Sequence, residues 1–472
     1  MKRPISICLA VVLAAGTLFA CGKRPTEQPV STAVESEEIT APALQPPIPY
    51  TADYPAQCHE QLDGIAVSDA SDFTWTESNG TVTVTGYKGS AAKVRIPDSI
   101  ADRPVTAIGD GAFADQTALT ALWIPDTVTD FGSGILSGCN ALEALHTPFP
   151  TDEGKNYFGY LYGAEEAKQN NTVALRALRW LEIGGNVTEI PDEAFFDCND
   201  LLCVLLPETI ERIGNYSFYQ CASLRGLSAE RLTAVGSHAL EGCQSLQKIE
   251  FGTVLRSVGF AALRNCDSLL SLTLPFIGQT GEENRFLGYL FGASAPSLAR
   301  GFYPPFLREL VLLPGCTSLA DLAICDCTSL QTVTLPDGMT AVGARTFSGC
   351  TALETVSFPA SLRTLGDGAF SGCIALTGIT FSEGLTGIGM NAFYGCRSLV
   401  SVSFPQTLTE LPPSCFAACR SLAEVDLGGV LTVGKDCFAD CPSISSVRGL
   451  GRQGMTVREG NDAILTVKTE KI

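Results

Sequence analysis

Apolar and polar residues alternate over short stretches that recur about every 23 residues along the chain. In "LETVSF", residues 353–358, the apolar Leu353, Val356 and Phe358 are set among polar residues, as in a strand with one buried face. Pro359 ends this strand, and the rest of the unit has apolar residues that we expect to turn inward at the back: Leu362, Leu365, Ala369 and Phe370. One unit cannot bury its own apolar face, whereas stacked units can, so the pattern predicts a solenoid with one parallel sheet.

One position of each unit is nearly always a cysteine, and Gln116 fills it once, one period before the first of them. Buried free cysteine behaves as a small apolar residue, so we expect a column of structural thiols. Neighbouring cysteines one strand spacing apart come close to disulfide geometry, and Cys415 with Cys437 is the pair that fits best. The C-x-C of Cys325 and Cys327 has no histidine nearby and is interpreted as core. The column consists of Cys139, Cys198, Cys221, Cys243, Cys266, Cys327, Cys350, Cys373, Cys396, Cys419 and Cys441.

Two gaps in the cysteine column contain inserts, near residues 148–175 and 275–305. The inserts resemble each other, since "FGYLYGAEEA" in the first matches "LGYLFGASAP" in the second. One interpretation is a loop-rich elaboration packed on the rim, with its own small hydrophobic cluster. The other is an aromatic ledge beside a binding face, formed by Tyr160, Tyr162, Tyr289 and Phe291.

The N-terminal residues have the pattern of an export signal: a basic start, then a short apolar run that ends in "LFACG". This ending resembles the lipobox of bacterial lipoproteins, which implies a signal peptide at 1–20 and lipid chains on Cys21. The alternative is an ordinary cleaved signal with an incidental cysteine. Residues 21–54 are rich in Pro, Thr and Glu and predict a semi-extended tether. We therefore expect an exported protein, lipid-anchored to the cell membrane and facing outside.

The repeating unit "C-x-x-L-x-x-V-x-[LF]-P-x-x-[LV]-x-x-[ILV]-G-x-x-A-F-x-x-C" resembles the BspA-like leucine-rich repeats of bacterial surface proteins over about residues 70–450. The resemblance implies an α/β-type horseshoe solenoid with short strands in a parallel concave sheet, irregular or 3-10 back turns, and a role in binding or adhesion. It carries no catalytic residues. The expected divisions are a small N-terminal β cap at 55–92, the repeats at 93–450 and a C-terminal cap strand at 451–472.

Side chains between the buried strand positions point to the concave side of the predicted sheet. In the first rungs this side is aromatic and apolar, and its candidate ligand-binding residues are Trp123, His146, Trp180 and Leu205. The alternative is that the first insert covers the two tryptophans. In the later rungs the same columns form a hydroxyl ladder, from Thr332 to Ser403. That ladder is typical of a solvated strand surface, or it suits a glycan or another chain's edge.

The charge balance and the absence of catalytic motifs argue against two classes of function, nucleic-acid binding and catalysis. The chain has 50 acidic and 31 basic residues, a net charge of -19, which argues against nucleic acid as a partner. It has three histidines and no H-E-x-x-H, G-x-S-x-G or phosphate-cradling glycine loop. We therefore predict no catalysis, cofactor or metal. We expect a membrane-anchored binding or adhesion module whose concave face takes proteins or glycans at the cell surface or extracellular matrix as partners. The alternatives are a structural envelope protein binding partners of its own cell, or a carbohydrate-binding or hydrolytic surface protein.

Overall fold

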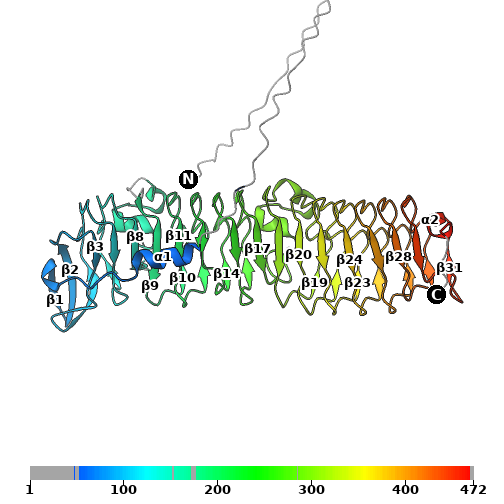
Figure 1. Cartoon of the computed structure of the whole chain (residues 1–472). Helices are drawn as coiled ribbons and strands as arrows, with labels where there is room; N and C mark the ends of the chain where they lie inside the picture. Colours follow the sequence, from blue (N-terminus) through cyan, green and yellow to red (C-terminus); the bar gives the residue numbers. More distant parts are fainter. Residues whose placement is uncertain are drawn as a thin grey trace, which may run out of the picture. The chain divides into compact units, whose positions relative to one another are not determined.

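The computed structural model describes residue 47 and residues 53–467, apart from 151, 153, 172–176 and 284. From Phe73 onward these residues form a solenoid in which most rungs place one short strand on each of two faces (Figure 1). The two rungs that carry the inserts have the first strand only. The signal peptide and most of the predicted tether, including Cys21, lie outside the described residues. Among the described residues, no helix is long and apolar enough to cross a membrane.

The first strand column forms two parallel sheets and confirms the predicted repeat. Along it, the central residue of each strand is buried and its neighbours point outward, as in β22, where Val356 lies between exposed Thr355 and Ser357. We call the outward side of this column the front face; it is the predicted concave side. The first sheet contains β3 (Lys93–Arg95), β6 (Ala121–Trp123), β8 (Ala144–Pro148), β9 (Trp180–Gly184), β11 (Cys203–Leu205) and β13 (Gly226–Leu227). The second contains β15 (Lys248–Glu250), β17 (Ser271–Leu274), β18 (Glu309–Leu312), β20 (Thr332–Thr334), β22 (Thr355–Ser357), β24 (Gly378–Thr380), β26 (Ser401–Ser403), β28 (Glu424–Asp426) and β30 (Ser446–Arg448).

A second column of two-residue strands follows the first and was not predicted. The leucine, isoleucine or valine that precedes the repeat's glycine lies inside it, as Leu365 does in β23, where it pairs with Val342 and Ile388. The column is made of β7 (Asp130–Phe131), β10 (Glu189–Ile190), β12 (Arg212–Ile213), β14 (Ala234–Val235), β16 (Ser257–Val258), β19 (Ser318–Leu319), β21 (Ala341–Val342), β23 (Thr364–Leu365), β25 (Gly387–Ile388), β27 (Glu410–Leu411), β29 (Thr432–Val433) and β31 (Thr456–Val457).

Phenylalanines at the back of the rungs stack into a buried column. In the C-terminal half, successive ring centroids are 5.0–5.8 Å apart and the planes are nearly parallel. Offset stacking of this kind adds to the free energy gained by burying the rings. The predicted inward position of Phe370 is confirmed, since its side chain is fully buried between Phe347 and Phe393. The column continues with Phe416 and Phe438.

The cysteine column has a polar role in addition to packing. Nine of its thiols each donate a hydrogen bond of 3.0–3.3 Å to the backbone carbonyl at the back of the preceding rung, as Cys396 does to Phe370. Gln116 keeps the donor role, since its Nε2 reaches the carbonyl of Tyr87 at 3.3 Å. All the described cysteines are buried free thiols, including the pair Cys415 and Cys437.

Each end of the solenoid has a different cap. The predicted N-terminal β cap is present: after the 3-10 turn η1 (Ala70–Asp72), β1 (Phe73–Ser78) and β2 (Thr81–Tyr87) pair as an antiparallel hairpin. β2 then pairs in parallel with β5 (Arg103–Ile108), and β4 (Ser99–Ile100) lies antiparallel to β5. The C-terminal end has β31 and the short helix α2 (Asp462–Leu465) in place of the single alternating strand that was predicted. Buried Asn461 completes this end by bonding the backbone of Phe438 and Gly434.

The two inserts have the same structure and belong to the back turns. The first contains the 3-10 turns η2 (Phe158–Tyr162) and η3 (Ala167–Gln169), and the second contains η5 (Leu287–Phe291) and η6 (Pro296–Gly301). In the first, the Tyr160 carbonyl accepts from Gly134 N and the Leu161 carbonyl accepts from Leu136 N. Tyr289 and Leu290 make the corresponding bonds in the second. Each insert therefore supplies the back turn of its own rung.

Candidate interaction face

The four predicted front-face residues come together on neighbouring strands. The register aligns Trp123 of β6 with His146 of β8, and His146 with Glu182 of β9. Glu182 is in turn opposite Leu205 of β11, while Trp180 lies in the parallel column beside Ala144 and opposite Cys203. The prediction that these side chains share one surface follows from strand alternation and is confirmed.

A helix that was not predicted covers this surface. Helix α1 (Tyr54–Leu62) crosses the front of the first sheet (Figure 1), within the segment assigned from the sequence to the end of the tether and the start of the β cap. The side chain of Asp53 caps it by accepting from Ala56 N at 3.1 Å, and Pro55 occupies its first turn. Its apolar residues follow a spacing of four, which places them on one side: Tyr54, Cys58 and Leu62.

The helix and the sheet form a hydrophobic cluster separate from the main core. From the helix side it contains Cys58, Leu62 and Ile65, and from the sheet side Ala121, Ala144, Cys203 and Leu205. Tyr54, Trp123 and Trp180 flank it and remain half-buried, with Tyr54 and Trp180 stacked at 6.4 Å. Leu205 is only 6% exposed. The alternative that the tryptophans are covered is therefore correct in its outcome, but the cover is α1 and not the first insert.

Small residues on the sheet make the seat for α1. Alanines occupy two front positions, at 121 and 144, and Gly226 occupies a third. A Cβ atom at Gly226 would lie 3.0 Å from both Cys203 Sγ and Tyr54 Cβ, so a side chain here would crowd the docked helix. The sequence signals for α1 were the start "DYP" and the spacing of Tyr54, Cys58 and Leu62, inside a segment whose Pro, Thr and Glu content favours a tether.

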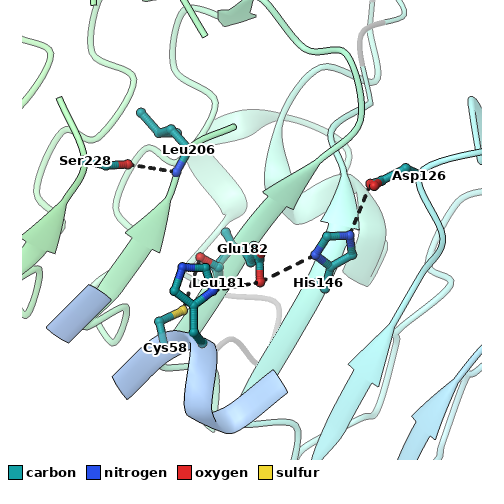
Figure 2. Close-up of polar contacts among 8 residues, drawn as sticks. Cys58, Asp126, His146, Leu181, Glu182, Leu206 and Ser228 are labelled. Atoms are coloured by element: carbon teal, nitrogen blue, oxygen red, sulfur yellow. Dashed lines mark hydrogen bonds and ion pairs between the residues drawn. The ribbon is translucent and has the colours of Figure 1, made fainter. Parts of the chain in front are cut away.

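A buried histidine lies at the edge of the covered surface. His146 is 3% exposed and stacks on Trp123 at a centroid distance of 3.7 Å, while Arg95 lies 4.5 Å from the Trp123 ring centroid. Its Nε2 donates to Asp126 Oδ1 at 3.1 Å, and its Nδ1 lies 3.7 Å from Glu182 Oε2 (Figure 2). His59 of α1 reaches the same Glu182 oxygen at 3.8 Å.

These contacts shift two pKa values. Burial acts to lower the pKa of His146, but the carboxylates of Asp126 and Glu182 outweigh it and hold the pKa above its usual value. The hydrogen bond from His146 lowers the pKa of the Asp126 carboxyl. The cluster is thus arranged to hold a positive imidazolium between two negative groups beneath the edge of α1.

The aromatic residues of the inserts do not join the front face. Tyr162 and Phe291 are buried core residues, 4% and 0% exposed, so the interpretation of a four-residue aromatic ledge is wrong for these two. Tyr160 and Tyr289 are half-buried, and their hydroxyls bond the Phe131 carbonyl and Gln279 Oε1. The physical reason is that η2 and η5 form back turns, whose large side chains extend the core.

The C-terminal part of the front face is open. From β20 to β26 both outward columns are exposed, which places the predicted hydroxyl ladder in contact with solvent. A shallow cleft of about 320 Å³ continues from the ladder onto charged residues, with Ser401 and Ser403 on one side and Glu424, Asp426 and Arg448 on the other. A second cleft, of about 580 Å³, lies beyond the start of α1 and is lined by residues that include Tyr54, Arg225, Glu230, Lys248 and Glu250.

Within the described part of the chain, no group of three or more His, Cys, Asp or Glu side chains is arranged to hold a metal ion. Burial raises the pKa of column thiols such as Cys373, to about 12, which disfavours the nucleophilic thiolate, whereas the hydrogen bond with Cys419 lowers the pKa of Cys441. The absence of catalysis and of a cofactor stays a prediction from the sequence.

Comparison with solved structures returns leucine-rich repeat proteins. One from Bacteroides ovatus is 21% identical, covers 84% of this chain and 99% of its own, and has a TM-score of 0.37. A leucine-rich cell surface protein from Faecalibacterium prausnitzii is 25% identical, covers 77% of this chain and 95% of its own, and has a TM-score of 0.31. The pneumococcal vaccine antigen PcpA is 16% identical, with coverages of 86% and 99% and a TM-score of 0.31. Among curated proteins, none matches the sequence.

The repeats themselves identify the family. The BspA type leucine-rich repeat region matches residues 87–158, 169–288, 301–372 and 317–445, which is more than half of the chain. These ranges include every strand of the front face except β30, whereas most of the inserts' 3-10 turns, residues 159–168 and 289–300, lies between them. The residues that recur in them are those that fill the strand centres, the phenylalanine column and the cysteine column. The chain therefore belongs to the BspA-type leucine-rich repeat proteins.

Proposed function

We propose that this protein is a binding module displayed on the outside of the cell and held there by a lipid on Cys21. The export pattern and the ending "LFACG" support the location. The acidic composition supports a partner other than nucleic acid. The partner is a protein of the cell surface or the extracellular matrix, and binding serves adhesion.

The observation that carries this proposal is the open front face from β20 to β30. From β20 to β26 its two outward columns are exposed and, apart from Gly378, carry hydroxyl groups. Beyond them lies a cleft with charges of both signs near Arg448. Such a surface offers hydrogen-bond donors and acceptors over several rungs, which is how a repeat array builds an extended binding site. The aromatic surface under α1 is not available for this purpose while the helix is docked.

The test compares two arginine variants of the full chain, held in mild detergent, as bait against matrix proteins, mucins and envelope extract. Thr355→Arg/Ser401→Arg places two large cations on the front face, whereas Thr409→Arg places one on an exposed position before β27 in the second column. We expect a matrix protein or mucin to be captured, with affinity lowered roughly tenfold or more by the double variant, about 1.4 kcal/mol, and unchanged by the control.

Two outcomes would redirect the proposal. Capture from envelope extract alone would favour the structural envelope role over adhesion. Equal binding by the wild type and the double variant would remove the front face between β20 and β30 as the site and leave the cleft beside Tyr54 as the next surface.

A further inference from the structure

Two cysteines from distant parts of the sequence meet at the contact between α1 and the front face. Cys58 is on the helix and Cys203 is on β11, and neither side chain is exposed to solvent. The Cys58 thiol hydrogen-bonds to Cys203, and its sulfur lies 3.7 Å from the carbonyl oxygen of Leu181 on the neighbouring strand β9 (Figure 2). Both thiols belong to the hydrophobic cluster between the helix and the sheet, where α1 lies against β11.

This pair differs from the cysteines of the repeat column. Nine of the eleven column thiols donate to a backbone carbonyl of the rung before them, so the repeat fixes their bonding partner. Cys419 and Cys441 of the column also hydrogen-bond to each other, but they join two rungs that the strand ladders already hold. Cys58 lies outside the repeat, and nothing in the packing of the rungs requires a thiol at its position.

We propose that Cys58 and Cys203 are a thiol–disulfide pair that locks helix α1 onto the front face. The oxidant is a small-molecule or protein disulfide, RSSR. The Cys58 thiolate attacks it, forming a mixed disulfide and releasing one RS⁻. The Cys203 thiolate then attacks the Cys58 sulfur, forming the Cys58–Cys203 bond and releasing the second RS⁻. The two protein thiols lose two electrons to RSSR and two protons to solvent.

The burial of the pair sets the order of events. The hydrogen bond with Cys203 and burial raise the pKa of the Cys58 thiol far above its usual value, so the docked thiol is a poor nucleophile. Oxidant reaches Cys58 when α1 is lifted from its seat. The return of the helix then brings the Cys58 sulfur against Cys203, which completes the bond. Because docking of α1 brings the Cys58 sulfur next to Cys203, it is docking that makes Cys203 the second thiol of the disulfide.

The lock determines whether the aromatic part of the front face can be exposed. In the dithiol form α1 is held by apolar contacts, by the stacking of Tyr54 on Trp180 and by His59 beside Glu182. In the disulfide form the same helix is tied to β11 by a covalent bond. Trp123, Trp180 and Leu205 therefore become available to a second binding event only in the dithiol form. This inference does not depend on the proposed adhesion through the C-terminal rungs.

The experiment maps the bond and the mobility of the helix together. The full chain, reduced and then held in mild detergent, is treated with cystamine, alkylated with N-ethylmaleimide and digested. Cys198 and Cys203 share one tryptic fragment, between Arg179 and Arg212, so a second cleavage before Asp200 is needed to separate them. Hydrogen exchange of the α1 amides is followed in the dithiol and oxidised forms, with Cys203→Ser and Cys419→Ser as matched variants.

We expect a Cys58–Cys203 peptide in large excess over any Cys419–Cys441 peptide, and roughly tenfold slower exchange in α1 after oxidation. Cys203→Ser abolishes both effects and Cys419→Ser neither, while unchanged exchange in β18–β22, away from both substitutions, shows that each variant is folded. The proposal is overturned if another pair dominates, if no linked peptide forms, or if the bond forms and the exchange of α1 stays the same.

Discussion

The cysteine column shows how one residue type satisfies two requirements of a tightly wound rung. The position is buried, which favours a small apolar side chain, and it faces a carbonyl oxygen at the back of the preceding rung, which favours a donor. A thiol meets both needs, since it is apolar enough for the core and its S–H is a weak donor. Gln116, at the first rung where the slot is partly open, meets the second need with an amide.

A substitution pair at Cys396 separates the two roles. Cys396→Val keeps an apolar side chain and removes the donor, whereas Cys396→Ser keeps a donor and reduces the apolar surface. Because an unpaired buried carbonyl costs about 1–3 kcal/mol, we expect Val to destabilise more than Ser, by about 1 kcal/mol. Urea unfolding of both variants measures this difference. If the serine variant is the less stable one, the thiol serves packing alone.

His146 predicts a pH dependence at the edge of the α1 seat. Its pKa is raised in the folded protein because Asp126 and Glu182 outweigh the effect of burial. A group with a raised pKa contributes stability that is fully present below its unfolded value, about 6.5, and lost as the pH rises through the folded value. The stabilising effect of His146 should therefore be larger at pH 5.5–6 than at about pH 8.5.

The measurement is the difference in thermal stability between the wild type and His146→Asn at a series of pH values. Taking the difference removes the contributions of other titrating groups, and the lost stacking on Trp123 gives an offset that does not vary with pH. The difference in thermal stability between the wild type and His146→Asn should become smaller as the pH rises. A difference that is constant across the series would show that folding does not shift the pKa of His146, and one that widens with rising pH would show that His146 stays neutral in the folded protein.

At the scale of elements, alternation and repetition in the sequence predict the strands of the first column. They do not predict elements that are very short or whose formation depends on contacts with distant parts of the chain. The strands of the first column were predicted because Val356 and its equivalents alternate with exposed residues in every rung. The second column was missed because two residues such as Thr364 and Leu365 are too short to show a period. Helix α1 has nine residues, too few to be stable alone, and its formation depends on the apolar seat provided by strands far away in the sequence.

For the candidate site, the sequence predicted which residues share one surface, but not the helix that covers them. Trp123, His146, Trp180 and Leu205 were placed on one surface by strand alternation, and the register confirms it. Their covering by α1 could not be predicted, because the match between Cys58, Leu62 and the alanines of β6 and β8 exists only after the sheet has formed.

Removing the apolar contact of α1 should release the helix without unfolding the array. Leu62 is 1% exposed, so Leu62→Asp buries a charge or lifts the helix, at a cost of several kcal/mol to docking. We expect acrylamide to quench Trp123 and Trp180 more strongly in this variant. The thermal unfolding of the rungs should change little, because the solenoid is held together by contacts between neighbours.

The matched control for this experiment is Ala56→Asp, which adds the same charge on the exposed side of the helix. An acidic group in the first turn is favourable for a helix, so quenching should stay at the wild-type level. Equal quenching in Leu62→Asp and wild type would mean that α1 does not depend on its apolar side for docking.

At the scale of the whole molecule, the chain is a linear array in which each part contacts mainly its neighbours. The hairpin of β1 and β2 closes one end, and buried Asn461 with α2 closes the other. Such ends are needed because the apolar interior of the last rung would otherwise face water. The connection of the array to a membrane, through a lipid on Cys21 and the residues that follow it, is a prediction from the sequence.

The lipid anchor is tested at Cys21. In cells that export the wild-type protein, metabolic labelling with an alkyne fatty acid should label it, and it should remain with the membrane fraction. Cys21→Ser removes the attachment point, so the label should be lost and the mature protein should be found in the soluble fraction. Labelling that is equal in both proteins, or absent from both, would support the ordinary cleaved signal.

The position of α1 has a mechanical consequence. The helix is the first described element after the predicted tether, so any tension transmitted from the membrane enters the folded array through Asp53 and Tyr54. With free thiols, a pull peels α1 from the sheet one contact at a time and uncovers Trp180 beneath Tyr54. With Cys58 bonded to Cys203, the load passes directly from the helix to β11, and residues 59–202 carry none of it when a partner holds the C-terminal rungs. The oxidation state of one sulfur pair would then decide whether the protein yields under shear or resists it.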